Sequence, residues 1–236
     1  MDIKKEPKND KEIKKRRSKS KINLCAPKLE WIHILARKLD PTIRMAKDAM
    51  DELSRLILMV ANMLVDRSIS MTHKVGKKII TKDTLQSVIR VHIPGELAKH
   101  CIVEGSNAVE TWLKNIENTA IRPTSREYTG LTFGVTQSAR IYKQHNVKCV
   151  DSEKVYLAGV QQYLTTFILQ GVIRVTKESL KMNTVKVSHI RTHLSTHPEL
   201  RMLFHSLGFD GLVFFHAHKR RRSKSGSRTR TRQSKA

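Results

Sequence analysis

The sequence predicts an all-α protein built from two similar halves, with a basic tail at each end. Apolar residues recur at helical spacing in two long segments, and each long segment is followed by a basic loop and a shorter helix. Lys and Arg number 45 against 21 for Asp and Glu, a formal net charge of +24. This balance favours a polyanionic partner, either nucleic acid or an anionic membrane surface.

Both terminal segments are predicted to be disordered, over residues 1–27 and 216–236. Residues 1–30 carry eleven basic and five acidic residues, and residues 219–236 carry nine basic and no acidic ones. Both segments have few apolar residues, so they cannot bury enough surface to offset the entropy of ordering. Each also contains four consecutive basic residues, a cluster of the type that nuclear import machinery reads.

The first half is expected to contain a short helix, a long helix and two more helices. Asp40-Pro41 ends the first of them, because proline lacks an N–H donor and disfavours helix in the residue before it. Gly76 ends the long helix, and Pro94-Gly95 separates the last two. The expected helices are 29–39, about 46–73, 82–91 and 96–113.

The second half repeats this plan after roughly 100 residues. Its expected helices are 133–144, about 152–180, 187–195 and one that begins at His197-Pro198. Each long helix has a broad apolar face that its own half cannot cover, so the two halves should cross and bury these faces on each other. We place the halves at 28–115 and 128–215, and residues 116–127 form a connector that makes the pairing intramolecular.

Other classes of protein fit the composition poorly. Aromatic residues make up only 5% of the chain, which disfavours a stacking platform for single-stranded nucleic acid. Cys25, Cys101 and Cys149 lie far apart with no CxxC pair, so a reducing compartment is expected. The longest apolar run, 56–65, is far shorter than a transmembrane helix, and the N-terminus lacks the apolar stretch of a secretory signal. We therefore expect a soluble, intracellular protein.

No catalytic or metal site is expected, and no cofactor. His189, His193 and His197 are spaced four apart, but Pro198 should end the helix before the third can share a face with the others. We interpret them as surface histidines near DNA or a partner. The glycines lack the flanking residues of a phosphate-binding loop or a nucleophile elbow, and Cys101 is expected to pack in the core.

Several motifs carry a resemblance to a known family. The run Pro94-Gly95-Glu96-Leu97-Ala98-Lys99-His100 resembles the start of the last helix of histone 2B. In the second half, Gly130-Leu131-x-Phe133, Val155-Tyr156-Leu157-Ala158 and Tyr163-Leu164-Thr165 are similar to histone 2A. The chain thus resembles a fused histone 2B–histone 2A doublet, of the kind found in Marseillevirus-like giant DNA viruses, over about residues 28–215.

The resemblance implies two tandem histone folds in an intramolecular handshake. In that arrangement the first loop of each half lies beside the second loop of the other. It also implies that the N-termini of the two long helices point at one stretch of phosphates. Basic side chains from the paired loops would then bind the minor groove without reading bases.

The DNA-binding residues follow from matching the family's motifs one position at a time. Lys148 stands where the family has a minor-groove arginine, and Thr184 stands where a further arginine is expected. Lysine keeps the charge but loses the planar guanidinium, so binding at such positions should be weaker. The predicted DNA-binding residues are Arg44, Lys47, Lys77, Lys78, Arg140, Lys143, Lys148, Lys181 and Lys186.

The family's acidic patch, on which chromatin factors dock, is mostly lost. Glu96, Glu104 and Glu199 remain. The other matching positions hold Gln162, Phe167, Gln170, His197 and Pro198. Factors that read an acidic patch through arginine should therefore bind poorly.

We expect a non-enzymatic DNA-packaging protein that binds duplex DNA with steep salt dependence. The resemblance implies assembly with a histone 3–histone 4 type partner, and with a second copy of this chain, into nucleosome-like particles. A viral protein would be located in a viral factory or the host nucleus, and in the virion; otherwise the location would be chromatin in the nucleus. The alternative is a histone-fold subunit of a transcription-regulatory complex, but the sequence shows no segment that would read bases.

Overall fold

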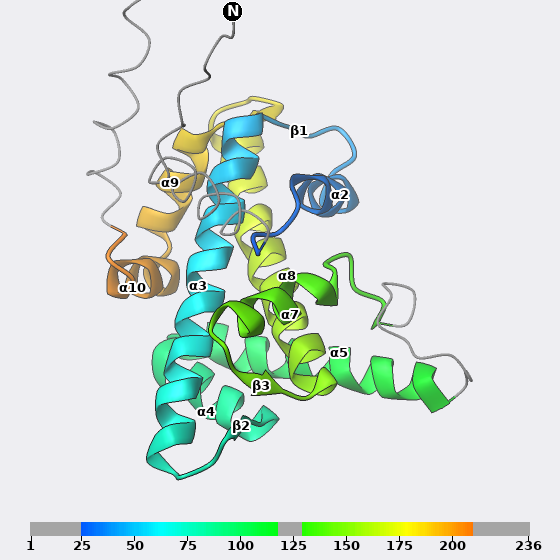
Figure 1. The fold of residues 1–236 in the computed structure, drawn as a ribbon. Helices are drawn as coiled ribbons and strands as arrows, with labels where there is room; N and C mark the ends of the chain where they lie inside the picture. The colour runs from blue at the N-terminus through cyan, green and yellow to red at the C-terminus, as the bar shows by residue number, and fades with distance from the viewer. Residues whose placement is uncertain (1–24, 118–128, 210–236) are drawn as a thin grey trace, which may run out of the picture.

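The computed structural model describes residues 25–117 and 129–209, and these are predominantly helical (Figure 1). The helices are α2 (Leu29–Leu39), α3 (Lys47–Lys74), α4 (Lys82–His92), α5 (Gly95–Glu117), α7 (Val135–Gln144), α8 (Asp151–Arg174), α9 (Val187–Thr196) and α10 (Pro198–Ser206). The all-α class and the repeated order of short, long and short helices are confirmed. The predicted tails lie largely outside the described residues, as does most of the predicted connector.

Two helix ends differ from the prediction. The second long helix is α-helical only as far as Arg174 and continues as a π-helical turn, η1 (Val175–Ser179). There the N–H of Leu180 donates to the carbonyl of Val175, five residues back, at 3.2 Å. Helix α5 is longer than expected and runs to Glu117.

Four two-residue strands, absent from the prediction, join the loops of the two halves. They are β1 (Arg44–Met45), β2 (Ile79–Ile80), β3 (Lys148–Cys149) and β4 (Thr184–Val185). Strand β1 pairs in parallel with β4, and β2 pairs in parallel with β3. The first loop of each half thus lies beside the second loop of the other, which is the predicted handshake of two histone folds.

The two long helices run in opposite directions (Figure 1). Helix α3 begins just after β1, whereas α8 begins just after β3, so their N-termini lie at opposite ends of the molecule. The expectation that both N-termini point at one stretch of phosphates is therefore wrong. The handshake requires the two long helices to run in opposite directions, because the first loop of each half must reach the second loop of the other.

The core forms where the long helices pack on each other and where α5 packs on α8. Leu56, Ile57, Leu64, Leu157 and Ile168 of α3 and α8 are fully buried. Helix α5 approaches α8 closely because the contact contains small residues. A Cβ atom added at Gly159 would lie 2.8 Å from the Cβ of Ala108 and 3.1 Å from the carbonyl oxygen of Glu104.

Polar contacts also tie the halves together. Glu52 on α3 is only 9% exposed, and its carboxylate accepts from Arg191 on α9 (3.4 Å) and Arg55 (2.6 Å).

None of the helices in residues 25–117 and 129–209 combines the length and the apolar composition that a membrane-spanning helix needs.

Candidate nucleic-acid interface

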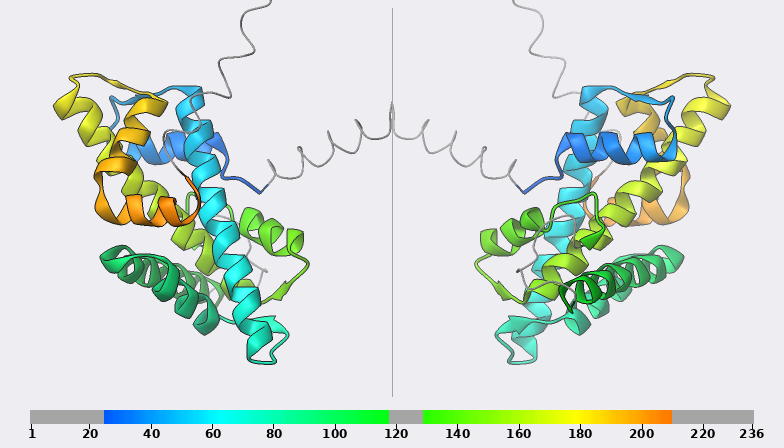
Figure 2. Two further views of the ribbon diagram at one scale, coloured as in Figure 1. Left: turned by 90° about the vertical axis from the view of Figure 1, so that its left-hand side faces the viewer. Right: turned by 90° about the vertical axis from the view of Figure 1, so that its right-hand side faces the viewer.

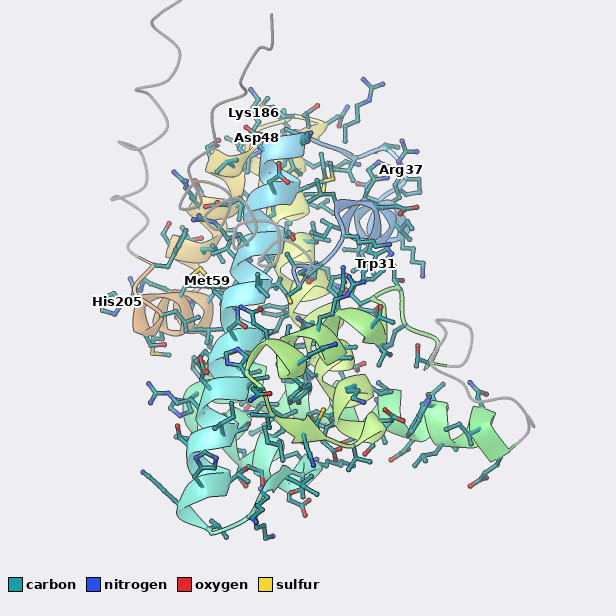
Figure 3. The ribbon with its side chains drawn as sticks, viewed as in Figure 1. Trp31, Arg37, Asp48, Met59, Lys186 and His205 are labelled. Atoms are coloured by element: carbon teal, nitrogen blue, oxygen red, sulfur yellow. The ribbon has the colours of Figure 1, made fainter. Side chains whose placement is uncertain are left out.

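The pairing of β1 with β4 collects basic residues from both halves at one end of the molecule. This β1–β4 end comprises Arg44, Lys47, Lys181 and Lys186, all of them exposed. Arg44 is the register partner of Thr184, the position where an arginine was expected. An arginine of the first half therefore occupies the position directly across the strand pair from Thr184. Figure 3 shows Lys186 at the same end as Asp48, in the first turn of α3.

The pairing of β2 with β3 forms the opposite end. This β2–β3 end comprises Lys77, Lys78 and Lys148, again all exposed. A hollow of about 280 Å³ lies between the loops, with Lys78, Lys148 and His73 on its lining and Ile69, Ile80 and Val147 among its apolar members. His73 is an addition to the predicted set, since its position in the last turn of α3 becomes significant only once the loops are paired.

The short helices α2 and α7 contribute the remaining basic residues. Arg140 and Lys143 are exposed on α7, as a DNA-binding role requires. Arg37, which the sequence analysis missed, is exposed in the last turn of α2, as Lys143 is in the last turn of α7 (Figure 3). The signal that could have found Arg37 is the internal repeat, because α2 and α7 are the first short helices of their halves.

Some nearby lysines are held by carboxylates. Lys177 in η1 forms an ion pair with Asp40 and donates to Oγ1 of Thr42 at 2.6 Å. The hydrogen bonds from Lys177 and Thr42 lower the pKa of Asp40 to about 2. Lys154 likewise donates to Asp151 at 2.6 Å. These two lysines are therefore less available to phosphates than the residues of the two ends.

The first turns of both long helices lie beside the strand pairs, but acidic side chains offset their positive field. Their N-cap residues, Ala46 and Val150, have no side chain that could accept from the free N–H groups. An uncapped helix N-terminus carries partial positive charge and attracts anions. In α3, however, Asp48 accepts from the backbone N–H of the next residue at 3.0 Å, and α8 has Asp151 and Glu153 in its first turn. The helix termini therefore add little to the attraction of either end for phosphates.

The remaining acidic residues have unequal roles. Glu199 accepts from the backbone N–H groups of Glu96 (2.8 Å) and Leu97 (3.2 Å), so α10 caps the N-terminus of α5. Figure 2 shows α10 next to α5. Glu96 pairs with Lys99 at 2.7 Å, and Glu104 is exposed. Two of the three carboxylates are therefore already engaged within the chain.

Aromatic rings occupy part of the surface where the family carries acids. A hollow of about 560 Å³ lies between α5 and α8, lined by Glu104, Gln162, Tyr163, Phe167 and Gln170 among others. The rings of Tyr163 and Phe167 stack at 6.0 Å, and the ring of His197 meets Phe167 edge-on at 5.2 Å. Among the described residues that line this hollow, Glu104 alone carries a carboxylate.

Two of the three spaced histidines are core residues, contrary to the prediction that they lie on the surface. His189 is 6% exposed and His193 only 4%. Burial, with help from His197 and Arg174, lowers the pKa of His193 to about 4. Within the described residues, no group of three or more His, Cys, Asp or Glu side chains could hold a metal ion.

Comparison with known proteins gives limited additional information. No protein-family model matches the chain. Among solved structures, the chain is similar to the histone from Methanopyrus kandleri, with a TM-score of 0.45 and 14% sequence identity. The alignment covers 72% of this chain and 93% of that one. The handshake described above rests on the helix order and loop pairing of this chain itself.

Proposed function

We propose that this protein packages duplex DNA, binding it through phosphate and minor-groove contacts without sequence preference. The observation that carries the proposal is the loop pairing, which gathers basic side chains of both halves into two exposed ends. The helix α3 that connects these ends has 28 residues, a length of about 42 Å. Since one turn of duplex measures about 34–36 Å, both ends could contact successive turns of the same DNA.

The proposal includes assembly into a nucleosome-like particle with a histone 3–histone 4 type partner and a second copy of this chain. Exposed apolar residues near the contact between α3 and α4 support a protein interface there, namely Met71, Val75 and Val91. We expect no catalysis. The packaging role would place the protein in nuclear chromatin or, for a viral protein, in the viral factory or host nucleus and in the virion.

The salt dependence of DNA binding tests the DNA-binding role. Each phosphate contact contributes about 0.9 to the slope of log K against log salt for duplex DNA. Lys148→Gln and Arg44→Gln should each lower the slope by about that amount, on random as well as defined sequences. Arg201→Gln, which removes an exposed arginine of α10, is the matched control. Slopes equal to the control for both variants would contradict the proposed interface.

Nuclease digestion tests the packaging role. DNA reconstituted with this protein and a histone 3–histone 4 type partner should give a discrete protected fragment on the order of 100–150 bp. Omitting the partner should abolish that fragment. A smear in both reactions would mean that the protein coats DNA without forming a particle.

A further inference from the structure

Helix α9 buries two histidines against the rest of the protein. The ring of His193 lies against the backbone of α8 at Gly171, where any Cβ atom would overlap the imidazole. Its Nε2 atom is buried and has no hydrogen-bond partner within residues 25–117 and 129–209, and the same is true of Nδ1 of the neighbouring His197. His189, one turn earlier, lies with Nδ1 3.1 Å from Oγ1 of Thr176. Neutral histidines fit this packing, whereas a protonated His193 would be a buried, unpaired cation.

Among the residues that the structure describes, the charged groups of α9 and of the elements packed around it offer no free, buried carboxylate to neutralise that cation. They are Arg174 on α8, Lys177 and Glu178 on η1, Glu52 and Arg55 on α3, Lys186, Arg191 and His197 flanking or within the α9 segment, and Glu199 on α10. Among the carboxylates, Glu52 is bound by two arginines and Glu199 caps α5. Glu178 is exposed to solvent. Arg174 disfavours a second positive charge nearby.

The matching helix of the first half lacks this feature. Strands β2 and β4 have the same place in the two halves, so α4 aligns with α9 from Lys82 and Val187 onward. Leu85 and Ile89 then match Ile190 and Leu194, and all four are buried. The positions that match His189 and His193 hold Thr84 and Val88, neither of which titrates in this range. Helix α4 does carry His92 in its last turn, and burial lowers the pKa of that ring as well, but His92 is only half-buried. The response to acid should therefore be stronger at the β1–β4 end.

We propose that acidification releases α9 from α8, so that strand β4 leaves β1 and the β1–β4 end opens while the β2–β3 end persists. Helix α9 follows β4 directly, with Lys186 between them, so movement of α9 displaces basic residues of the β1–β4 end. Release of α9 would also loosen α10 and the cap that Glu199 provides to α5. The opening itself is independent of DNA, and only its effect on binding rests on the proposed function.

The pH window follows from the neutral state of His193 in the closed form. Its pKa is about 4 in the folded protein against an ordinary value of 6.5, so the open form takes up the proton first as the pH falls. The contribution of neutral His193 to the stability of the closed form is therefore fully present above about pH 6.5, and it is progressively lost as the pH falls to about 4. Between pH 7 and pH 5 the opening equilibrium should rise about twenty-fold.

Hydrogen exchange of the full chain at pH 7 and pH 5, corrected for intrinsic rates, tests the opening directly. Residues 184–196 should lose protection by about twenty-fold at pH 5, and residues 79–92, which include the half-buried His92, should lose clearly less. His193→Phe and His193→Gln, each checked for helicity at pH 7, should remove most of the response. His100→Gln, which removes an exposed histidine, should keep it. Equal loss at both ends, or an unchanged response in either His193 variant that folds, would overturn the proposal.

Footprinting on DNA provides the second measurement. Protonating surface histidines strengthens the attraction to DNA, so acid should otherwise tighten binding. We expect instead that protection at pH 5 is lost where the β1–β4 end binds and kept where the β2–β3 end binds. A protein that binds no DNA at pH 7 would refute the proposed function, while the exchange experiment would still decide the acid response.

Discussion

Replacing Glu199 with alanine should destabilise the protein by about 1–2 kcal/mol. The side chain accepts from two N–H groups in the first turn of α5, at 2.8 and 3.2 Å. Loss of a helix N-cap costs about 0.5–2 kcal/mol, and a carboxylate at that position adds about 0.3–1 kcal/mol through the helix dipole. The contact joins residues more than one hundred positions apart, so its loss also weakens the docking of α10 on α5.

Thermal and urea denaturation, followed by circular dichroism at pH 7, measure this effect. A change of this size should lower Tm by about 2–8 °C for a domain of this length. Glu110→Ala, which removes an exposed glutamate of α5, is the control and should stay within about 0.5 kcal/mol of the parent. Glu199→Gln should be intermediate, since the amide keeps one acceptor. A Glu199→Ala protein as stable as the Glu110→Ala control would refute the assignment of Glu199 as the cap.

Two further predictions concern the contacts between the halves. Gly159→Ala should lower the urea midpoint, because the new methyl group would lie 2.8 Å from the Cβ of Ala108. Overpacking costs about 1–3 kcal/mol, whereas alanine regains about 1 kcal/mol in helix propensity. A raised midpoint would contradict the close approach of α5 and α8. The Asp40 carboxyl should titrate by NMR near its pKa of about 2, so that its pairing with Lys177 contributes to stability above pH 3.8 and is lost as the pH falls through 2. Lys177→Gln should return the Asp40 midpoint toward the ordinary range, and an unchanged midpoint would show that Lys177 is not the cause.

The sequence by itself determined the helices, because their ends depend on neighbouring residues. Asp40-Pro41 ends α2 at Leu39, as predicted, since proline acts on the residue before it. Gly76, with φ of 70°, adopts the left-handed conformation just after α3, which few other residues adopt readily. The repeat of about 100 residues and the apolar faces of the long helices likewise predicted that the two halves bury each other. The exposure of the basic residues was also predictable, because unpaired lysine and arginine are rarely buried.

Tertiary structure alone decided which of those residues act together. Strand pairing across 140 residues places Arg44 beside Thr184, and opposed long helices place the two N-termini at opposite ends. Residues so far apart in sequence have no local signal that sets their distance, and the resemblance predicted the pairing but not the direction of the helix ends. Histidine burial was missed for a similar reason, since a titratable ring can enter a core wherever a glycine of another helix leaves room, as Gly171 does for His193.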